Sequence, residues 1–147
     1  MINFNIEKIA PLCSEFGVEI TPEIVARLNL YGNLLIEWNE KINLTAIKDD
    51  EGIAIKHFID SISFLKSHNI KPGAKVIDVG TGAGFPGVPL KIYCPSLKVT
   101  LIDSLSKRLK FLQQVIDELE LENISCVHLR AEDAGRNKAY REKFDLV

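Results

Sequence analysis

One run of sequence determines the predicted fold: VIDVGTGAGFPG, residues 76–87. Residues 76–79 are typical of a buried β-strand, and a glycine-rich turn follows them directly. Glycine adopts positive φ angles without strain, and without a Cβ it lets a ligand approach the backbone closely. The run therefore predicts a strand, then a ligand-binding turn, then a helix whose N-terminus favours a negative group such as a carboxylate.

From residue 75 onward, short β-rich runs alternate with helical stretches. The expected strands are Lys75–Val79, Lys98–Asp103, Ile124–Leu129 and Phe144–Val147. The expected helices between them include Pro89–Tyr93 and Lys107–Leu121. Strands that alternate with helices form right-handed βαβ units, so we predict a parallel sheet and the α/β fold class.

The first 70 residues have a helical pattern instead. Thr21-Pro22-Glu23 is typical of a helix start, because a hydroxyl cap, a proline and an acid all suit the first turn. A second helix, expected from about Glu51, contains His57, and a lone histidine there is more often structural than catalytic. We expect a helical cap over residues 1–70 and the first part of an α/β domain over residues 71–147, joined at a Lys-Pro-Gly turn.

Composition limits the possible classes of function. A length of 147 residues with 46% hydrophobic content fits one globular domain, and no apolar run approaches a membrane span. The N-terminus lacks the basic-then-apolar order of a secretory signal, so we expect a cytoplasmic protein. A net charge of −2 argues against binding of nucleic acid by the overall field. Local basic patches at residues 107–110 and 136–143 are candidate RNA contacts, and each also fits a solvated face.

The three cysteines, Cys13, Cys94 and Cys126, are far apart in the sequence. They form no CxxC pair that could hold zinc or act as a redox couple. We therefore expect no metal site and three buried, reduced thiols.

Acidic side chains follow the glycine turn at the ends of the next strands. Asp103 ends the second expected strand roughly twenty residues past the glycines, where it can accept hydrogen bonds from both ribose hydroxyls of an adenosine ligand. The segment 130–133 follows the third strand at the same edge of the sheet and contributes Glu132. These strand ends together predict a site for an adenosine-bearing cofactor.

Two cofactors fit this pattern. Gly82, Gly84 and Gly87 satisfy the G-x-G-x-x-G register of dinucleotide-binding folds, so an NAD-dependent oxidoreductase is an alternative. Asp78 favours S-adenosylmethionine, because an acid just ahead of the glycines suits the amino group of a methionine moiety and does not suit a pyrophosphate.

Several motifs together resemble the RsmG (GidB) family of bacterial ribosomal RNA methyltransferases. They are EWN (37–39), NLTAI (43–47), HFIDSI (57–62), DVGTGAGFPG (78–87), DS (103–104), KR (107–108) and FL (111–112). The resemblance covers about residues 30–147. It implies a Rossmann-like class I S-adenosylmethionine-dependent methyltransferase fold and methylation of guanosine N7 in 16S ribosomal RNA, with the RNA or a ribosomal particle as partner.

The resemblance also implies cofactor contacts from Gly80, Phe85, Asp103, Ala131 and Glu132. Together with Asp78, Gly82, Gly84 and Ser104, which lie in the glycine run and after the second strand, they form the predicted cofactor site. Guanine N7 carries a lone pair and no proton, so methyl transfer needs no general base and no catalytic residue is expected.

Members of this family continue for several more strands and helices. We therefore expect a C-terminally truncated chain that binds cofactor weakly, has little activity and is prone to self-association through an open sheet edge. A non-catalytic RNA-binding module, with salt-dependent RNA binding and no cofactor binding, is a further alternative.

Overall fold

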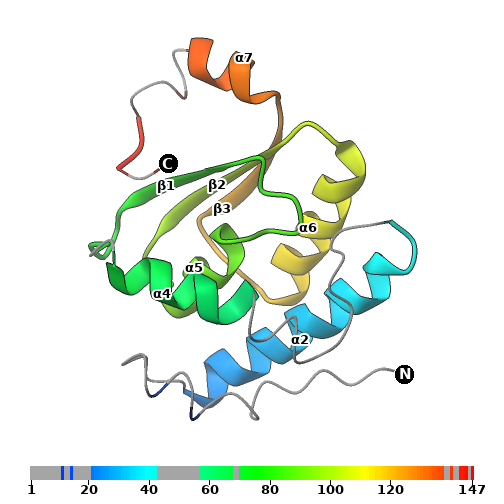
Figure 1. Cartoon of the computed structure of the whole chain (residues 1–147), viewed down its shortest axis with the longest axis vertical. Coiled ribbons are helices and arrows are strands. Elements are labelled where there is room, and N and C mark those ends of the chain that lie inside the picture. The colour runs from blue at the N-terminus through cyan, green and yellow to red at the C-terminus, as the bar shows by residue number, and fades with distance from the viewer. Residues whose placement is uncertain are drawn as a thin grey trace.

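A computed structural model describes residues 11, 14, 21–42, 57–67, 70–137, 140, 143–145 and 147. Its elements alternate from β1 onward between strands and helices, and among the described residues the helices α2 and α4 come before them (Figure 1). In chain order they are α2 (Pro22–Asn39), α4 (Asp60–Ser67), β1 (Lys75–Val79), α5 (Gly87–Tyr93), β2 (Lys98–Asp103), α6 (Ser106–Glu118), β3 (Ile124–His128) and α7 (Ala131–Arg136).

The three strands form a parallel sheet in the order β1-β2-β3. Helix α5 connects β1 to β2 and α6 connects β2 to β3, so both crossovers run in the same direction and lie on one face of the sheet. Helix α2 packs against α5 and α6, and α4 packs against α5. This arrangement confirms the predicted parallel α/β architecture, and all three strands begin at the predicted residues.

The alternation of side chains along the strands divides the apolar residues between the two faces of the sheet. Val76, Val99 and Leu101 belong to the large core on the helix-covered face, which also contains Tyr31 of α2. Ile77 and Ile102 point to the opposite face, where they form a smaller cluster with Ala134 of α7. Full burial of a side chain such as Leu101 stabilises the fold by about 1.5–3 kcal/mol.

Helix α2 begins as the sequence predicts. The Thr21 side chain accepts a hydrogen bond from the backbone N–H of Ile24 (3.3 Å), and Pro22 occupies the first turn. Leu28, Tyr31 and Leu35 lie fully buried on one stripe of the helix. The helical segments described within residues 1–70 therefore share one hydrophobic core with the α/β unit, while a domain boundary at residue 70 stays a prediction.

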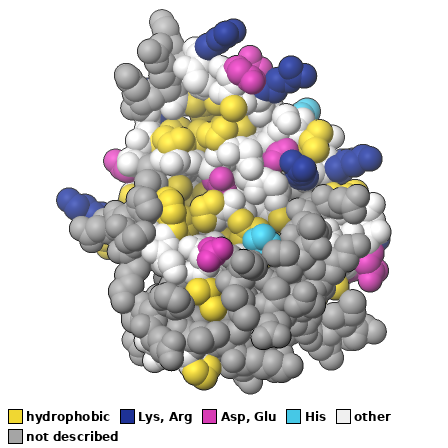
Figure 2. Space-filling view, in the orientation of Figure 1, with side chains coloured by type: hydrophobic (Ala, Val, Ile, Leu, Met, Phe, Trp, Pro, Cys, Tyr) yellow, Lys and Arg dark blue, Asp and Glu magenta, His cyan; other side chains and the backbone are white. Residues whose placement is uncertain are grey.

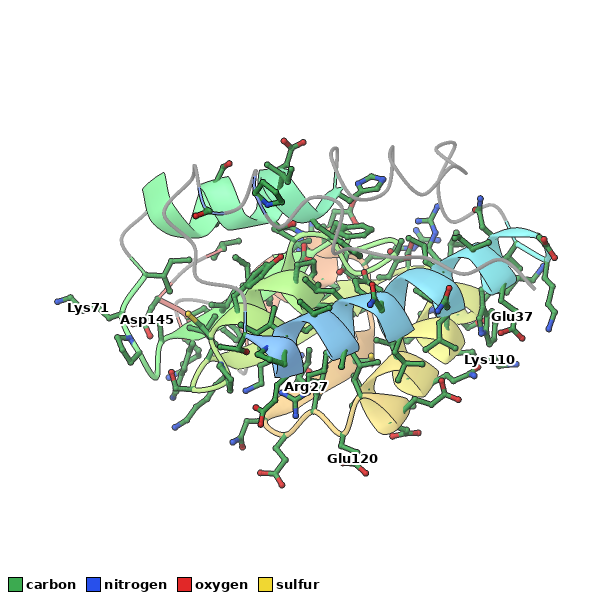
Figure 3. All side chains as sticks on the ribbon, turned by 90° about the horizontal axis from the view of Figure 1, so that it is seen from below. Arg27, Glu37, Lys71, Lys110, Glu120 and Asp145 are labelled. Carbon is green, nitrogen blue, oxygen red and sulfur yellow. The ribbon has the colours of Figure 1, made fainter. Side chains whose placement is uncertain are left out.

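The prediction of a fourth strand over residues 144–147 is wrong for the residues that the structure describes there. The Asp145 backbone N–H donates to the Lys75 carbonyl (2.8 Å), and its carboxylate accepts from the Lys75 backbone N–H (2.7 Å). The Asp145 side chain thus accepts from a backbone N–H that would otherwise be available for pairing with a neighbouring strand. The segment still lies at the start of β1, and Figure 3 shows Asp145 at the same end of the molecule as Lys71.

Other expectations meet the described residues only in part. Helix α4 begins at Asp60, and the expected start near Glu51 lies outside the described residues. Cys94 and Cys126 are free thiols but only half-buried, which corrects the expectation of full burial, and Cys13 lies outside the described residues. No helix in the described part of the chain is both long and apolar enough to cross a membrane.

Candidate functional site

The glycine turn after β1 is bonded to the neighbouring strand. The backbone N–H groups of Gly80 and Thr81 both donate to the Ile102 carbonyl, at 2.9 and 3.0 Å. Gly80, Gly82 and Gly84 have φ angles of +70°, +61° and +98°, a region that residues with a side chain rarely adopt. The positive φ angles predicted for this turn are therefore present.

Asp103, the last residue of β2, holds the turn from the other side. Its Oδ2 accepts from the Gly82 backbone N–H (2.9 Å) and its Oδ1 from the Leu105 backbone N–H (2.9 Å). The Arg108 guanidinium lies 3.5 Å from Oδ2. Because the Asp103 side chain is only 2% exposed, these partners compensate the cost of burying its charge.

Asp78 accepts hydrogen bonds from both ends of the same turn. Its Oδ2 accepts from the Thr81 hydroxyl (2.7 Å) and from the Gly87 backbone N–H (3.0 Å), which opens α5. Burial raises the pKa of this carboxyl, the two hydrogen bonds oppose that shift, and the charge of Asp103 adds to it. Asp78 therefore has an evident structural function within the turn.

A cavity of ≈ 480 Å³ opens where the three strands end. Its lining comes from the glycine turn, from the β2–α6 connection and from the start of α7. The lining residues are Gly80, Asp103, Ser104, Leu105, Arg108, Leu129, Arg130, Ala131 and Glu132. Figure 2 shows Lys and Arg side chains, with acidic ones between them, over the upper part of this face, the region of α7 in Figure 1.

The structure brings five of the nine predicted cofactor residues together in this lining: Gly80, Asp103, Ser104, Ala131 and Glu132. The other four lie outside it. Gly82 donates to Asp103, and Gly84 packs so tightly that an added Cβ would meet three side chains. Asp78 and Phe85 face the helix-covered side, where Phe85 contacts other aromatic rings.

Four lining residues were absent from the predicted set: Leu105, Arg108, Leu129 and Arg130. Leu105, Leu129 and Arg130 lie within two residues of a strand end, so the expected strand boundaries could have predicted them as lining residues. Arg108 was noted as part of a basic patch and of the KR motif (107–108), but not as a cofactor residue. Its link to Asp103 depends on the turn between β2 and α6, which sequence spacing alone does not reveal.

Comparison with known proteins identifies relatives over nearly the whole chain. The family model described as GidB, rRNA small subunit methyltransferase G, matches residues 24–147. Ribosomal RNA small subunit methyltransferase G of Alkaliphilus metalliredigens (strain QYMF) is 51% identical over 135 residues, covering 92% of this chain and 56% of that protein. The protein of the same name from Thermoanaerobacter sp. (strain X514) is 49% identical over 146 residues, covering 99% of this chain and 61% of that protein. The chain therefore spans little more than half the length of these curated relatives.

Solved structures with a similar fold are more distant in sequence. A protein-L-isoaspartate O-methyltransferase from Plasmodium falciparum, in complex with S-adenosyl-L-homocysteine, has a TM-score of 0.55 at 18% identity and covers 92% of this chain and 67% of its own. A second protein-L-isoaspartate O-methyltransferase has a TM-score of 0.54 at 17% identity, covering 85% of this chain and 42% of its own. At these identities the likeness concerns the fold alone, and it confirms the Rossmann-like class I methyltransferase fold.

Proposed function

The chain belongs to the rRNA small subunit methyltransferase G (GidB) family, and on that basis we propose that it forms the S-adenosylmethionine-binding part of an enzyme that methylates guanosine N7 in 16S ribosomal RNA. One observation carries the proposal. Gly80 after β1, Asp103 at the end of β2 and Glu132 after β3 line a single cavity. Ligands of open α/β sheets bind at this carboxyl edge.

The residues around the cavity fit such a cofactor. Its volume of ≈ 480 Å³ lies within the usual range of small-molecule pockets, about 300–1,000 Å³. Asp103 accepts three hydrogen bonds, and a carboxylate has roughly four lone-pair positions, so one remains for a ribose hydroxyl. Leu105 and Leu129 offer apolar contact to an adenine ring, and Gly80 keeps its side of the cavity free of a side chain.

When bound, S-adenosylmethionine supplies an activated methyl group on a sulfonium. Guanine N7 has an exposed lone pair and no proton to lose, so this chain needs no general base. Its residues contribute by holding the cofactor in a fixed orientation toward the target base. Such positioning can lower a barrier by several kcal/mol.

The proposal extends to partner and location. A small-subunit ribosomal RNA, as naked RNA or within a ribosomal particle, is the expected substrate, and the cytoplasm is the expected compartment. Arg130 at the cavity and Lys107 near it, both exposed, are candidate phosphate contacts. Self-association through an open sheet edge is a separate expectation that sedimentation can test.

The deciding experiment is isothermal titration of S-adenosylhomocysteine into this chain. We expect a Kd in the micromolar range and a loss of at least tenfold in Gly80→Val. Gly73→Val is the matched control. Both glycines have positive φ angles, +70° and +78°, and neither would place a Cβ within 4 Å of another atom, but only Gly80 lines the cavity.

The rival functions are distinguished by titrating NADH or RNA in place of S-adenosylhomocysteine. Binding of NADH without S-adenosylhomocysteine would favour an oxidoreductase. Salt-dependent RNA binding without any nucleotide binding would favour a non-catalytic module. Equal losses of affinity in the two glycine variants would remove the support for the cavity as the cofactor site.

A further inference from the structure

Aromatic rings from the helical segments surround one residue of the glycine turn. Phe85 stacks on the His57 ring with a centroid distance of 4.3 Å and an interplanar angle of 15°. The Tyr31 ring of α2 lies 5.5 Å from Phe85, and the Phe58 ring lies 5.8 Å from it. These helical residues are more than 25 positions away in sequence, so the contacts are tertiary.

Tyr31 also contacts the backbone of the turn. Its hydroxyl donates to the Ala83 carbonyl over 2.5 Å. A Cβ added at Gly84 would lie 2.8 Å from the Tyr31 hydroxyl oxygen. Tyr31 is fully buried, so water is not at hand to replace this donor. Burial raises the pKa of Tyr31 well above its ordinary value, which keeps the hydroxyl protonated as a donor.

His57 is held in place in the π-helical turn that leads into α4. The Ser61 hydroxyl donates to the His57 carbonyl (2.7 Å), and the imidazole is half-buried against Phe85. Phe85 is followed by Pro86 and by Gly87, whose backbone N–H donates to Asp78. The histidine therefore contacts the end of the turn that leads into α5, while Tyr31 contacts its middle.

Both contacts are connected to the cavity through the turn. The Phe85 backbone N–H, beside the His57 ring, donates to the carbonyl of Thr81 (3.3 Å), which adjoins the cavity residue Gly80. Ala83 is adjacent to Gly82, and the Gly82 backbone N–H donates to Asp103, which lines the cavity with Gly80. We expect a displacement of Ala83 to disturb the Gly82–Asp103 bond, because a single planar peptide unit, between residues 82 and 83, separates the two bonded groups and few torsions can absorb the movement.

We propose that Tyr31 and His57 are positioning residues for the cofactor: through Ala83 and Phe85 they fix the glycine turn in the conformation that presents Gly80 and Asp103 to S-adenosylmethionine. The inference rests on the proposed function, since it assigns the cofactor to this cavity. It makes the helical segments part of the cofactor site although none of the described residues before β1 lines the cavity.

Tyr31→Phe tests the first residue with minimal change, because it removes one hydroxyl and keeps the ring contacts. We expect the Kd for S-adenosylhomocysteine to rise about five- to tenfold, in proportion to the loss of one buried hydrogen bond. Tyr93→Phe is the matched control, since Tyr93 packs on the same core at the last residue of α5, the end away from the turn. The titration stoichiometry separates the effects: a variant that only unfolds loses binding sites, whereas a misplaced turn keeps the sites and weakens each one.

His57 is tested by a pair of substitutions. His57→Phe preserves a flat ring against Phe85 and should bind within about twofold of the unmodified chain, whereas His57→Ala should bind about five- to tenfold more weakly. Rescue by the aromatic variant would identify the stack as the relevant contact. Equal affinity in the alanine variant, or an equal loss in both, would overturn the assignment for His57.

A ligand-free measurement keeps this inference distinct from the proposed function. Amide hydrogen exchange at Gly82 reports directly on its bond to Asp103. Faster Gly82 exchange in Tyr31→Phe than in Tyr93→Phe would support the positioning role even if no S-adenosylhomocysteine bound to any form of the chain. Unchanged exchange together with unchanged affinity would refute it.

Discussion

Gly82 donates its backbone N–H to Oδ2 of Asp103 over 2.9 Å, so the turn that follows β1 is bonded to the acid that ends β2. A substitution that alters the Asp103 carboxylate should therefore disturb both the turn after β1 and the end of β2. Asp103 also accepts from the Leu105 backbone N–H and pairs with Arg108. These three partners make Asp103 a structural residue of the site as well as a candidate ligand for ribose.

We expect Asp103→Asn to lower the free energy of unfolding by about 2 kcal/mol. An amide offers one acceptor oxygen in place of two, so its NH₂ group would face a backbone N–H and one buried donor would lose its partner. Urea denaturation measures the loss. Asp117→Asn, an exposed position on α6 that accepts from Gln113 (3.0 Å), should change stability by less than about 0.5 kcal/mol. Similar values for the two variants would contradict the structural role of Asp103.

Gly84→Ala should be among the most damaging single changes in the turn. An added Cβ would lie 2.8 Å from the Tyr31 hydroxyl oxygen, 2.8 Å from Cγ2 of Val88 and 2.9 Å from Cδ2 of Leu112, at a φ of +98°. Overlap with packed side chains costs about 1–3 kcal/mol in addition to about 1–2 kcal/mol of backbone strain. Gly80→Ala, with a φ of +70° and open space around its Cβ, should show the strain alone. Denaturation midpoints of the two variants compare these costs, and equal midpoints would argue against the tight packing.

The Cys126 thiol should react slowly in the folded chain. Burial, assisted by the nearby charge of Asp117, raises the pKa of Cys126 to about 11. At about pH 8 the reactive thiolate is then roughly one part in a thousand, against roughly a quarter for an ordinary cysteine. Alkylation followed by peptide mass spectrometry should show at least a tenfold acceleration at Cys126 when the chain is unfolded in urea. Equal rates in the folded and unfolded chain would show that the thiol is not protected.

The parts of the fold that the sequence predicted have local signals. The glycine turn, the three strands and the capped start of α2 each follow from a few consecutive residues, because turn chemistry, alternation and helix capping act over short distances. The strand expected after residue 143 failed because Asp145 bonds to the backbone of Lys75, a contact between distant residues. Such a competing bond has no signature in the local pattern.

The candidate site divides in the same way. Gly80 and Asp103 were predictable because strand ends of a parallel sheet meet at one edge. The hydrogen bonds of Asp78 within its own turn, and the contact of Tyr31 with Ala83, depend on how the chain packs. Its charge alone therefore suggested that Asp78 binds the cofactor, whereas the structure shows that its carboxylate accepts a hydrogen bond from Gly87.

The stability of the chain should fall more steeply toward acid pH than in a variant that lacks the His57 imidazole. Burial lowers the pKa of His57, and the charge of Asp60 opposes the shift in part. The unfolded chain then binds a proton at a higher pH than the folded chain, so the free energy of unfolding decreases as pH falls from about 6.5 toward the lowered pKa. Above about pH 6.5 both states hold the neutral ring and the contribution is constant.

Urea denaturation at about pH 7.5 and about pH 5.0 tests this dependence in the unmodified chain and in His57→Phe, which retains a ring against Phe85 but does not titrate. The other two histidines, His68 and His128, and the carboxylates are common to both proteins, so the difference between the two pH dependences isolates His57. We expect the unmodified chain to lose more stability over this interval than the variant does. Parallel losses would mean that the imidazole takes up its proton equally well in the folded and unfolded states, which is incompatible with a ring buried against Phe85.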